Sequence, residues 1–564
     1  MNEAHDKTWT KNATGIGWRR CCAPDKRNGQ SFCILHKKLK GSPLAMKKSV
    51  FAIFLLAAVS VAAQWDEGAP RINGPKVYGA TTGRAFLYAF PTCGSREGLK
   101  FAVSDGRLPA GVVLDEKSGV LSGKVAEAGE YPFEVSAANA IGTARKRFSL
   151  VVGDRRALTP PMGWTSWSAF TTDVDQELVE ATAEAIVKKG LAAHGYAYVN
   201  VDSCWQGQRN SPKNAALQPN EKFPDMGAMV KKIHALGLKA GIYTTPMVHA
   251  WGSTRDRLLP GSTSYPLDPD YYHPQFGGCG KKGYEKEDAL QFAEWGFDWL
   301  KYDWSRTELH HTRIMREALN ATGRDFTLQV CTRAKLSDAR EYATCCELAR
   351  GNTDTKDDWK FLREHVMRRA DGWLPQVRPG FWYDLDMLAV GAMRIGRKGG
   401  VEHAPRPGQP LPKEMDNRMT RDEITSHFAW WAIIPTPLFL SCDIERIDDF
   451  TLSLVTNDDL IEINQDYPAK PATFENVDGG KRRIWRRDLS DGRKVLAFFN
   501  LGDDGEWKVS HPVGGTFAVR DVLAQANLGN RDSIEVVLPI HACKVYILEN
   551  WSADRDSPRE TFAR

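Results

Sequence analysis

A regular alternation of apolar runs and helical patterns between Thr159 and Asp466 constrains the fold of this chain most strongly. The helical patterns include Gln176–Lys189, Asp225–Leu236 and Asp357–Arg369. Eight runs have the character of buried strands: Met162–Trp167, Ala197–Asp202, Lys239–Thr244, Trp299–Asp303, Phe326–Val330, Leu348–Asp354, Gly380–Asp384 and Thr436–Ser441. Strands that alternate with helices predict a parallel α/β fold, and eight within about 300 residues fit one (β/α)₈ TIM barrel. The alternative, a doubly wound open sheet, needs a glycine-rich phosphate turn after the first strand, and the sequence lacks one.

Short alternating runs with Gly, Pro and Asp turns flank this region on both sides. Residues 64–153 predict a small β-sandwich, and residues 467–550 predict an antiparallel β-sandwich packed on the barrel. The barrel is assigned to residues 159–466, and residues 551–564 form a polar tail. The predicted fold class is therefore multidomain, with a (β/α)₈ barrel between an N-terminal and a C-terminal β-sandwich.

Residues 46–63 have the pattern of a secretory signal peptide. Met46 is followed by two lysines and a short apolar run, and Val61 and Ala63 take the −3 and −1 positions before Gln64. Residues 1–45 are then a mis-called upstream extension. The alternative is a short signal anchor behind a genuine basic N-terminus. We expect a secreted or periplasmic protein with no integral membrane segment in the mature chain; the oligomeric state stays open.

Composition narrows the class of partner. The chain is 42% hydrophobic, which indicates a globular protein. Its net charge is +5, but residues 1–45 hold nine Lys and Arg against three Asp and Glu, so the remainder carries −1. Charge therefore gives no support for a nucleic-acid partner. The cysteines show no CxxC spacing, so no zinc site is indicated.

Carboxylates and cations stand where the predicted barrel strands end. Lys301 and Asp303 end the fourth strand, and Arg350 and Asp354 end the sixth. These ends meet at one face of a barrel, where active sites lie. Glycoside hydrolysis needs two carboxyl groups in different environments. We expect Asp303 to stay ionised beside Lys301, which suits a nucleophile, and Asp354 is the candidate acid/base. The set lacks a His/Asp metal cluster and a GxSxG nucleophile elbow.

Seven motifs occur in one order along this region: Thr159–Trp167, Val201–Trp205, Leu238–Tyr243, Leu300–Asp303, Asp384–Leu388, Pro437–Ser441 and Ile463–Asp466. Together they resemble glycoside hydrolase family 27, the α-galactosidase and α-N-acetylgalactosaminidase family. The run Leu108–Gly123 resembles an immunoglobulin-like module found beside bacterial surface and carbohydrate enzymes. These resemblances imply an N-terminal Ig-like β-sandwich and a retaining, exo-acting glycoside hydrolase. They favour an α-galactosidase that releases terminal α-D-galactose from oligo- or polysaccharides.

The family resemblance assigns a role to each matching residue. Asp303 matches the nucleophile and Asp354 the general acid/base. The matching substrate-binding residues are Trp167, Asp202, Tyr243, Lys301, Arg350, Asp386 and Met387. The resemblance implies a carbohydrate substrate and no metal or organic cofactor. A retaining mechanism predicts carboxyl groups about 5–5.5 Å apart.

Departures from the family pattern leave the sugar open. Ser203 stands where the family usually has a second acid that binds outer hydroxyls, and Thr332 follows Cys331 where an acid is usual. The loop from Met247 to Gly283 is long and able to wall the pocket. The alternatives are the same mechanism on β-L-arabinopyranosides or α-N-acetylgalactosaminides, and, from another class, a non-catalytic carbohydrate-binding surface protein.

The cysteines follow the family only in part. Cys331 and Cys346 match a family disulfide, which the resemblance implies here. Cys204 and Cys279 lack their expected partners, so they either pair with each other or remain free thiols. In an exported protein either outcome is compatible with the redox environment.

Overall fold

The computed structural model describes residues 65–211, 213–254, 257–271, 277–304, 307–331, 333–393 and 417–550. The predicted upstream extension, signal peptide and polar tail lie outside these ranges. In the described part the chain has three regions: an N-terminal β-module, a parallel α/β barrel and a C-terminal β-domain. The predicted fold class is confirmed.

The N-terminal β-module is built from nine strands in three sheets. One sheet has the order β2-β9-β8-β5 and a second has the order β3-β7-β6, while β1 and β4 form a short pair. Phe and Tyr rings fill the core between the sheets. The strands are β1 (Arg71–Ile72), β2 (Val77–Thr81), β3 (Ala85–Ala89), β4 (Thr92–Cys93), β5 (Lys100–Gly106), β6 (Val112–Leu114), β7 (Val120–Lys124), β8 (Gly129–Ala138) and β9 (Thr143–Gly153).

Eight parallel strands form the barrel sheet, in the order β20-β19-β18-β17-β12-β11-β10-β21. A bridge between Leu388 and Leu440 joins the segment after β20 to β21, so the two ends of this order meet. The strands are β10 (Met162–Thr165), β11 (Tyr198–Asn200), β12 (Lys239–Thr244), β17 (Trp299–Asp303), β18 (Thr327–Cys331), β19 (Leu348–Ala349), β20 (Trp382–Tyr383) and β21 (Leu438–Leu440). Their near-complete burial explains why they are continuous apolar runs.

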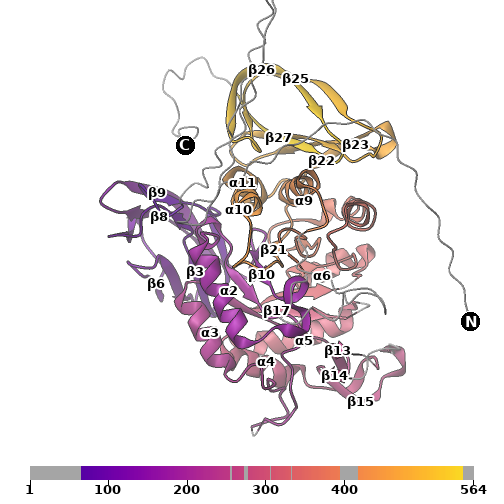
Figure 1. Cartoon of the computed structure of the whole chain (residues 1–564). Coiled ribbons are helices and arrows are strands. Elements are labelled where there is room, and N and C mark those ends of the chain that lie inside the picture. Colours follow the sequence, from indigo (N-terminus) through magenta and orange to yellow (C-terminus); the bar gives the residue numbers. More distant parts are fainter. Residues whose placement is uncertain are drawn as a thin grey trace, which may run out of the picture. The chain divides into compact units, whose positions relative to one another are not determined.

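Helices follow the strands along the chain, as the alternating pattern predicted (Figure 1). Asp175 and Asp225 cap α2 and α3 by accepting a backbone N–H, and Thr420 and Glu423 form a capping box on α9. The helices are α1 (Trp167–Phe170), α2 (Gln176–Lys188), α3 (Met226–Ala235), α4 (Glu285–Trp295), α5 (Leu309–Ala321), α6 (Ala339–Cys345), α7 (Trp359–Phe361), η5 (Leu362–Met367, a π-helix), α8 (Arg368–Ala370), α9 (Arg421–Ile433), α10 (Asp449–Val455) and α11 (Asp458–Gln465).

A long insertion between β12 and α4 folds into two antiparallel pairs. The first joins β13 (His249–Thr254) to β14 (Arg257–Pro260), and the second joins β15 (Thr263–Leu267) to β16 (Gly280–Gly283). This is the segment that the sequence indicated as a long loop able to wall the pocket. Its strands rise from the carboxyl end of β12, on the face where a barrel enzyme carries its site.

The C-terminal domain is an antiparallel ladder of six strands, in the order β22-β23-β24-β27-β25-β26. Figure 1 shows the long strands β25 and β26 arching over β27, β22 and β23. Irregular register in β25 lets the ladder bend, and a second apolar core fills the space inside. The strands are β22 (Thr473–Val477), β23 (Arg482–Asp488), β24 (Lys494–Asn500), β25 (Trp507–Asp521), β26 (Ala526–Leu538) and β27 (Cys543–Asn550).

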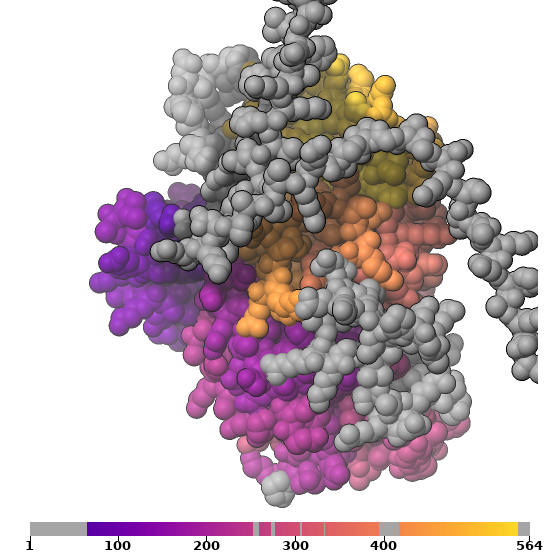
Figure 2. Space-filling view, in the orientation of Figure 1, coloured from indigo at the N-terminus to yellow at the C-terminus, as the bar shows by residue number. Residues whose placement is uncertain are grey.

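One apolar core runs from the barrel into the C-terminal domain, because Trp485 and Phe499 pack with the barrel helices. The Trp430 ring meets both of these rings edge to face. Side chains fill the spaces between the ribbons, as the space-filling view shows (Figure 2). The C-terminal domain therefore shares one apolar core with the barrel and is not an independently packed domain.

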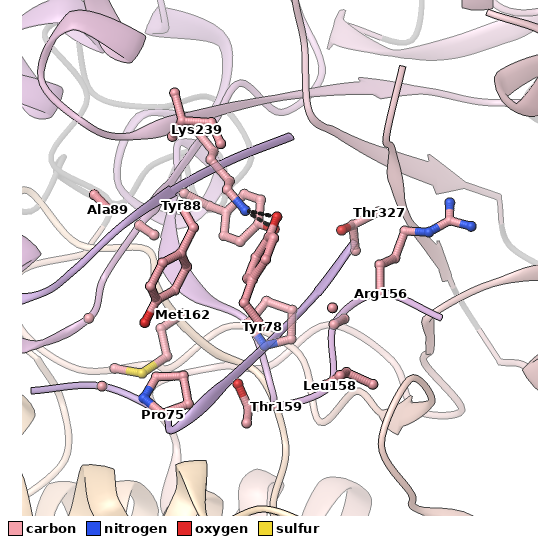
Figure 3. Close-up of a pocket in the computed structure, with 18 of the residues that line it drawn as sticks. Pro75, Tyr78, Tyr88, Ala89, Arg156, Leu158, Thr159, Met162, Lys239 and Thr327 are labelled. Atoms are coloured by element: carbon pink, nitrogen blue, oxygen red, sulfur yellow. Dashed lines mark hydrogen bonds between the residues drawn. The ribbon is translucent and has the colours of Figure 1, made fainter. Parts of the chain in front are cut away.

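The β-module contacts the amino-terminal end of the barrel around a cavity of about 90 Å³. Lys239, at the start of β12, reaches into this region and donates to the Tyr78 hydroxyl at 2.7 Å (Figure 3). Its ammonium group also lies 5.1 Å from the centre of the Tyr198 ring. Thr81 of the module hydrogen-bonds Asp325 of the barrel through both its N–H and its hydroxyl.

A second contact between module and barrel is a partly buried polar cluster. Asp458 accepts from the Arg71 guanidinium at 2.6 Å and from His194 Nδ1 at 2.7 Å. His194 Nε2 lies 3.6 Å from the Cys93 sulfur. Burial lowers the pKa of His194, but these partners outweigh it and raise the pKa to about 9. The imidazole is therefore a cation at neutral pH, and it links the module to α11.

Within the described residues, no helix has both the length and the apolar character needed to cross a membrane.

Candidate active site

The carboxyl end of β17 carries the two side chains that organise the site. Lys301 and Asp303 alternate with apolar residues, so both project from one face of the strand. The Lys301 ammonium lies 4.0 Å from an Asp303 carboxylate oxygen. It donates a shorter hydrogen bond, 2.7 Å, to Asp202. Lys301 is therefore shared between two carboxylates from neighbouring parts of the barrel.

Asp202 follows β11 and is held by three hydrogen bonds. Its Oδ2 accepts from Lys301 and, at 3.4 Å, from the Thr165 hydroxyl. Its Oδ1 accepts the Ser203 backbone N–H at 2.8 Å. Asp202 is only 3% exposed. A carboxylate fixed in this way keeps few free lone pairs, which face the small space at the centre of the site.

Arg350 follows β19 and holds two carboxylates with one guanidinium group. Nη2 donates to Asp354 at 2.7 Å, and Nη1 donates to Asp386. Arg350 is fully buried, whereas the Asp354 side chain is 54% exposed. The exposed position gives Asp354 access to water and to a ligand, while Arg350 fixes its direction.

Asp386 adopts a strained backbone conformation to reach Arg350. Its φ is +75°, a left-handed conformation that non-glycine residues rarely adopt. Its Oδ2 accepts the Thr355 N–H at 2.6 Å, and its own N–H donates to Asp384 at 2.7 Å. Gln329 in turn donates to Asp384. Asp384 therefore supports the loop that carries Asp386, and Gln329 is a supporting residue that sequence reasoning missed.

Four of the predicted substrate-binding residues line one small cavity, and neither Asp303 nor Asp354 is among its lining residues. A small cavity of about 20 Å³ at the barrel centre is lined by Asp202, Lys301, Asp386 and Met387, together with Gln329, Asp384, Thr165, Asn200, Val201 and Phe439. The Lys301 ammonium lies 5.6 Å from the centre of the Tyr243 ring. Thr332 lies outside the described residues.

Two indole rings meet beside Ser203. Trp167, at the start of α1, is half-buried, and its ring lies 6.5 Å from that of Trp251 in an edge-to-face arrangement. Ser203 is 1% exposed, and its hydroxyl donates to the Trp251 carbonyl at 2.6 Å. Trp251 belongs to the insertion, whose length and position were the only sequence signals for it.

The two candidate carboxylates differ in their electrostatics. Burial raises the pKa of Asp303 to about 6, because Lys301 and Arg350 only partly offset it and Asp354 adds repulsion. Lys301 lowers the pKa of Asp303, as expected of a nearby cation, but burial outweighs it; with a pKa of about 6 the carboxyl is still mostly ionised at neutral pH. Burial also tends to raise the pKa of Asp354, but Arg350 and Lys301 outweigh it and hold that pKa below its usual range. The proton of this pair resides mainly on Asp303 in the free protein.

The structure does not contain the predicted disulfide between Cys331 and Cys346. Both are free, buried thiols, as is Cys279. Cys331 ends β18, where burial and the Asp303 carboxylate raise the pKa of its thiol. Cys346 follows α6 instead, where its thiol donates to the Tyr342 carbonyl at 3.3 Å beside Cys345. The two sulfurs thus belong to different environments, one inside the barrel rim and one under a helix.

Within the described ranges, no group of three or more His, Cys, Asp and Glu side chains is arranged to hold a metal ion.

Comparison with known proteins places this arrangement in a family. Residues 159–265 and 272–401 match the family model described as Alpha galactosidase A, and residues 479–548 match the Alpha galactosidase C-terminal beta sandwich domain. An α-galactosidase of Coffea arabica is 30% identical over 69% of this chain and 94% of its own length. Alpha-galactosidase A of Cellvibrio japonicus is 30% identical over 62% of this chain and 78% of its own. The chain belongs to the α-galactosidase family, glycoside hydrolase family 27.

Solved structures of family members agree with this assignment. A candidate α-galactosidase/melibiase from Bacteroides fragilis is 30% identical, with a TM-score of 0.72 over 86% of this chain and 99% of that one. A family 27 β-L-arabinopyranosidase from Geobacillus stearothermophilus shares the fold at 22% identity, with a TM-score of 0.62 over 71% and 98%. Residues 69–153 match a family of Ig domains, so the β-module is Ig-like as predicted. The protein is a glycosyl hydrolase whose catalytic barrel lies between two β-domains.

Proposed function

We propose that this family member is a retaining, exo-acting α-galactosidase, with Asp303 as nucleophile and Asp354 as general acid/base. The observation that carries the proposal is that two carboxylates which act on each other electrostatically lie in different environments. Asp303 is largely buried with its pKa raised, and Asp354 is half exposed on a guanidinium clamp. Different environments for two carboxyl groups are what a double displacement requires.

The proposed reaction starts from the state in which the pair holds one proton. With that proton on Asp354 and the Asp303 carboxylate free, Asp303 attacks the anomeric carbon while Asp354 protonates the departing glycosidic oxygen. Water then enters, Asp354 takes its proton, and the hydroxide oxygen displaces Asp303 from the sugar. The two inversions give net retention. Lys301 and Asp202 lie close enough to Asp303 to hold sugar hydroxyls during both steps.

For the reaction to start, substrate binding must favour the state in which Asp354 is protonated and Asp303 is ionised. In the free protein Arg350 keeps Asp354 mostly ionised. A sugar that covers Asp354 removes water from a carboxylate that is now 54% exposed, and loss of water favours the protonated form. Binding and proton transfer from Asp303 to Asp354 are therefore coupled in this proposal.

The roles are tested by replacing each carboxylate and adding azide as an external nucleophile. With an aryl α-galactoside carrying a good leaving group, Asp303→Gly should lose turnover and recover with azide, which attacks from the vacated face and gives β-galactosyl azide. Asp354→Gly should still form the covalent intermediate and give α-galactosyl azide. Asp532→Gly, at an exposed carboxylate in β26, is the matched control and should turn over like wild type.

The outcomes separate the alternatives. Wild-type turnover in Asp303→Gly would overturn the nucleophile assignment. A wild type inactive on the galactoside but active on the p-nitrophenyl β-L-arabinopyranoside or α-N-acetylgalactosaminide would keep the mechanism and change the sugar. Binding of galactose without turnover of any of these substrates would favour the non-catalytic alternative.

We further propose that the protein is exported to the periplasm or the medium by the segment that begins at Met46. This rests on the charged start, the apolar run and the small residues before Gln64. N-terminal sequencing of the protein purified from its source should begin at Gln64. A chain that begins at Met1 or Met46 would contradict the proposal.

A further inference from the structure

The strand order gives the active site two opposite sides. Counting around the eight strands, β11 and β19 are four steps apart in either direction, and β17 lies midway between them. Asp354 follows β19, Asp303 ends β17, and Ser203 follows β11. The proposed acid and Ser203 are therefore on opposite sides of the barrel mouth.

The chemistry of a pyranose ring fixes what each side contacts. The glycosidic oxygen on C1 must face the acid that protonates it, on the β19 side. C4 lies across the ring from C1, with C3 and the C5–C6 group on either side of it. The edge of the sugar remote from the scissile bond therefore faces the end of β11. A residue at the end of β11 therefore contacts the C4 and C6 substituents of the sugar.

Trp251 stands at this position. Its β13 strand pairs with β14 to form a hairpin that extends beyond β12, the strand next to β11. The Trp251 carbonyl accepts the Ser203 hydroxyl at 2.6 Å and lies 3.9 Å from the Cys204 thiol. Its ring meets Trp167 edge to face, so the two indoles make a corner. The half-buried Trp251 is thus attached to the end of β11 through its backbone.

The Ser203 hydroxyl is already committed to this contact. It has one hydrogen to donate, and that hydrogen lies on the Trp251 carbonyl. With 1% exposure, Ser203 also has almost no surface to offer a ligand. A side chain in this state acts on the substrate through the residue that it holds.

We propose that Trp251 is the wall that contacts the remote edge of the sugar and sets which glycone is accepted, and that Ser203 is a positioning residue for it. The inference rests on the proposed function, because it uses the side on which Asp354 acts. An indole packs against carbon-bound hydrogens and gives little to a hydroxyl. The C6 group of a galactoside is therefore recognised mainly by packing, worth about 10- to 200-fold per carbon in a fitted pocket.

The test compares two substrates that differ at C6. kcat and KM are measured on p-nitrophenyl α-D-galactopyranoside and on p-nitrophenyl β-L-arabinopyranoside, which has the same ring without C6. Trp251→Ala should lose about tenfold or more in kcat/KM on the galactoside, mostly through KM, and much less on the arabinopyranoside. Trp251→Phe keeps an aromatic wall and should restore most of the ratio.

Ser203→Ala should shift the same ratio in the same direction by a smaller factor, because the hairpin keeps its ladder but loses its anchor. Ser203→Thr keeps the hydroxyl and should behave like wild type. Trp507→Ala, at a half-buried tryptophan of the C-terminal domain, is the matched control and should leave the ratio unchanged. Equal losses on both substrates in Trp251→Ala, with Trp251→Phe no better, would overturn the inference. A wild type inactive on both substrates would instead mean that the proposed function has failed.

Discussion

Two buried lysines on the barrel, one at each end, are held in opposite ways. Lys301, at the carboxyl end of β17, lies between the carboxylates of Asp202 and Asp303. Lys239, at the amino end of β12, donates to tyrosine hydroxyls at 2.7 and 3.5 Å and faces their rings. Burial opposes the charge of both, yet the neighbours of each raise its pKa. The same cation thus lies among carboxylates at one end and among tyrosine rings at the other.

The difference separates an end built for chemistry from an end built for stability. At the carboxyl end burial raises the pKa of Asp303 to about 6, although Lys301 and Arg350 lower it, so the proton of the carboxylate pair is easily moved. At the amino end the Ig-like module covers the strands and leaves the Lys239 side chain buried. Substitutions at the two ends should therefore change different measured quantities.

The largest expected effect is at the carboxyl end. Asp303→Asn should lower kcat on an aryl α-galactoside by on the order of 10⁴- to 10⁶-fold, because the nucleophile is removed. Its unfolding temperature at pH 7 should not fall, since the buried carboxylate is repelled by Asp354 and poorly solvated. Steady-state kinetics measures the change in kcat, and thermal unfolding measures the change in unfolding temperature. A large loss of stability would show that Asp303, like Lys239, stabilises the fold, and would contradict the proposed difference between the two ends of the barrel.

Lys239→Met should show the reverse. The Tyr78 and Tyr198 hydroxyls lose their donor, and we expect a decrease of about 1–3 kcal/mol in the free energy of unfolding. kcat per folded molecule should stay at the wild-type value, because the residue lies at the other end of the barrel. Urea unfolding measures the change, and Lys231→Met, at an exposed lysine of α3, is the control. A fall in kcat without a fall in stability would contradict this assignment.

The pH dependence of kcat/KM sharpens the comparison further. The active state holds one proton on the Asp303–Asp354 pair, which exists between the lowered pKa of Asp354 and the pKa of about 6 at Asp303. kcat/KM should therefore be highest at acidic pH and fall about tenfold per pH unit above about pH 6. The raised pKa of Asp303 also makes its contribution to stability largest below the unfolded value, and that contribution is lost as pH rises through 6. A flat profile from pH 5 to 8 would contradict the assignment of the pair.

The smallest expected effect is at the contact between the module and the barrel. The pKa of His194 is raised to about 9, so its contribution to stability is complete below its unfolded pKa and is lost as pH rises through 9. His194→Gln should lower the unfolding free energy by about 1 kcal/mol at pH 6 and by less at pH 10. Thermal unfolding at both pH values tests this. An equal loss at both would show that packing, and not charge, holds the contact.

The sequence predicted the fold well where burial is continuous. The eight strands and the helices α2 and α3 lie within a few residues of their predicted positions, because buried apolar runs and helix caps are local signals. The sixth strand was predicted as Leu348–Asp354 but is only β19, since the residues after Ala349 turn to place Arg350 and Asp354 in the site. The predicted helix Asp357–Arg369 contains the π-helix η5, which no local pattern distinguishes from α.

The sequence predicted which residues form the site better than it predicted their pKa values. The family resemblance assigned roles to Asp303, Asp354 and Arg350, and the strand order brings all three together. The direction of the Asp303 pKa shift could not be derived, because burial in three dimensions decides it. Trp251 was also missed, since its contact with Ser203 joins positions 48 residues apart.

The pairing of β10 with β21, the first and last barrel strands along the chain, has a consequence for folding during synthesis. β10 is among the first barrel strands to leave the ribosome, but its partner β21 begins about 270 residues later, a delay of roughly 15–55 s at typical rates of synthesis. During that time one edge of β10 has no partner, and open strand edges promote association between chains. Chains that stop before Leu438 should therefore aggregate in the cell even though they contain every proposed catalytic residue.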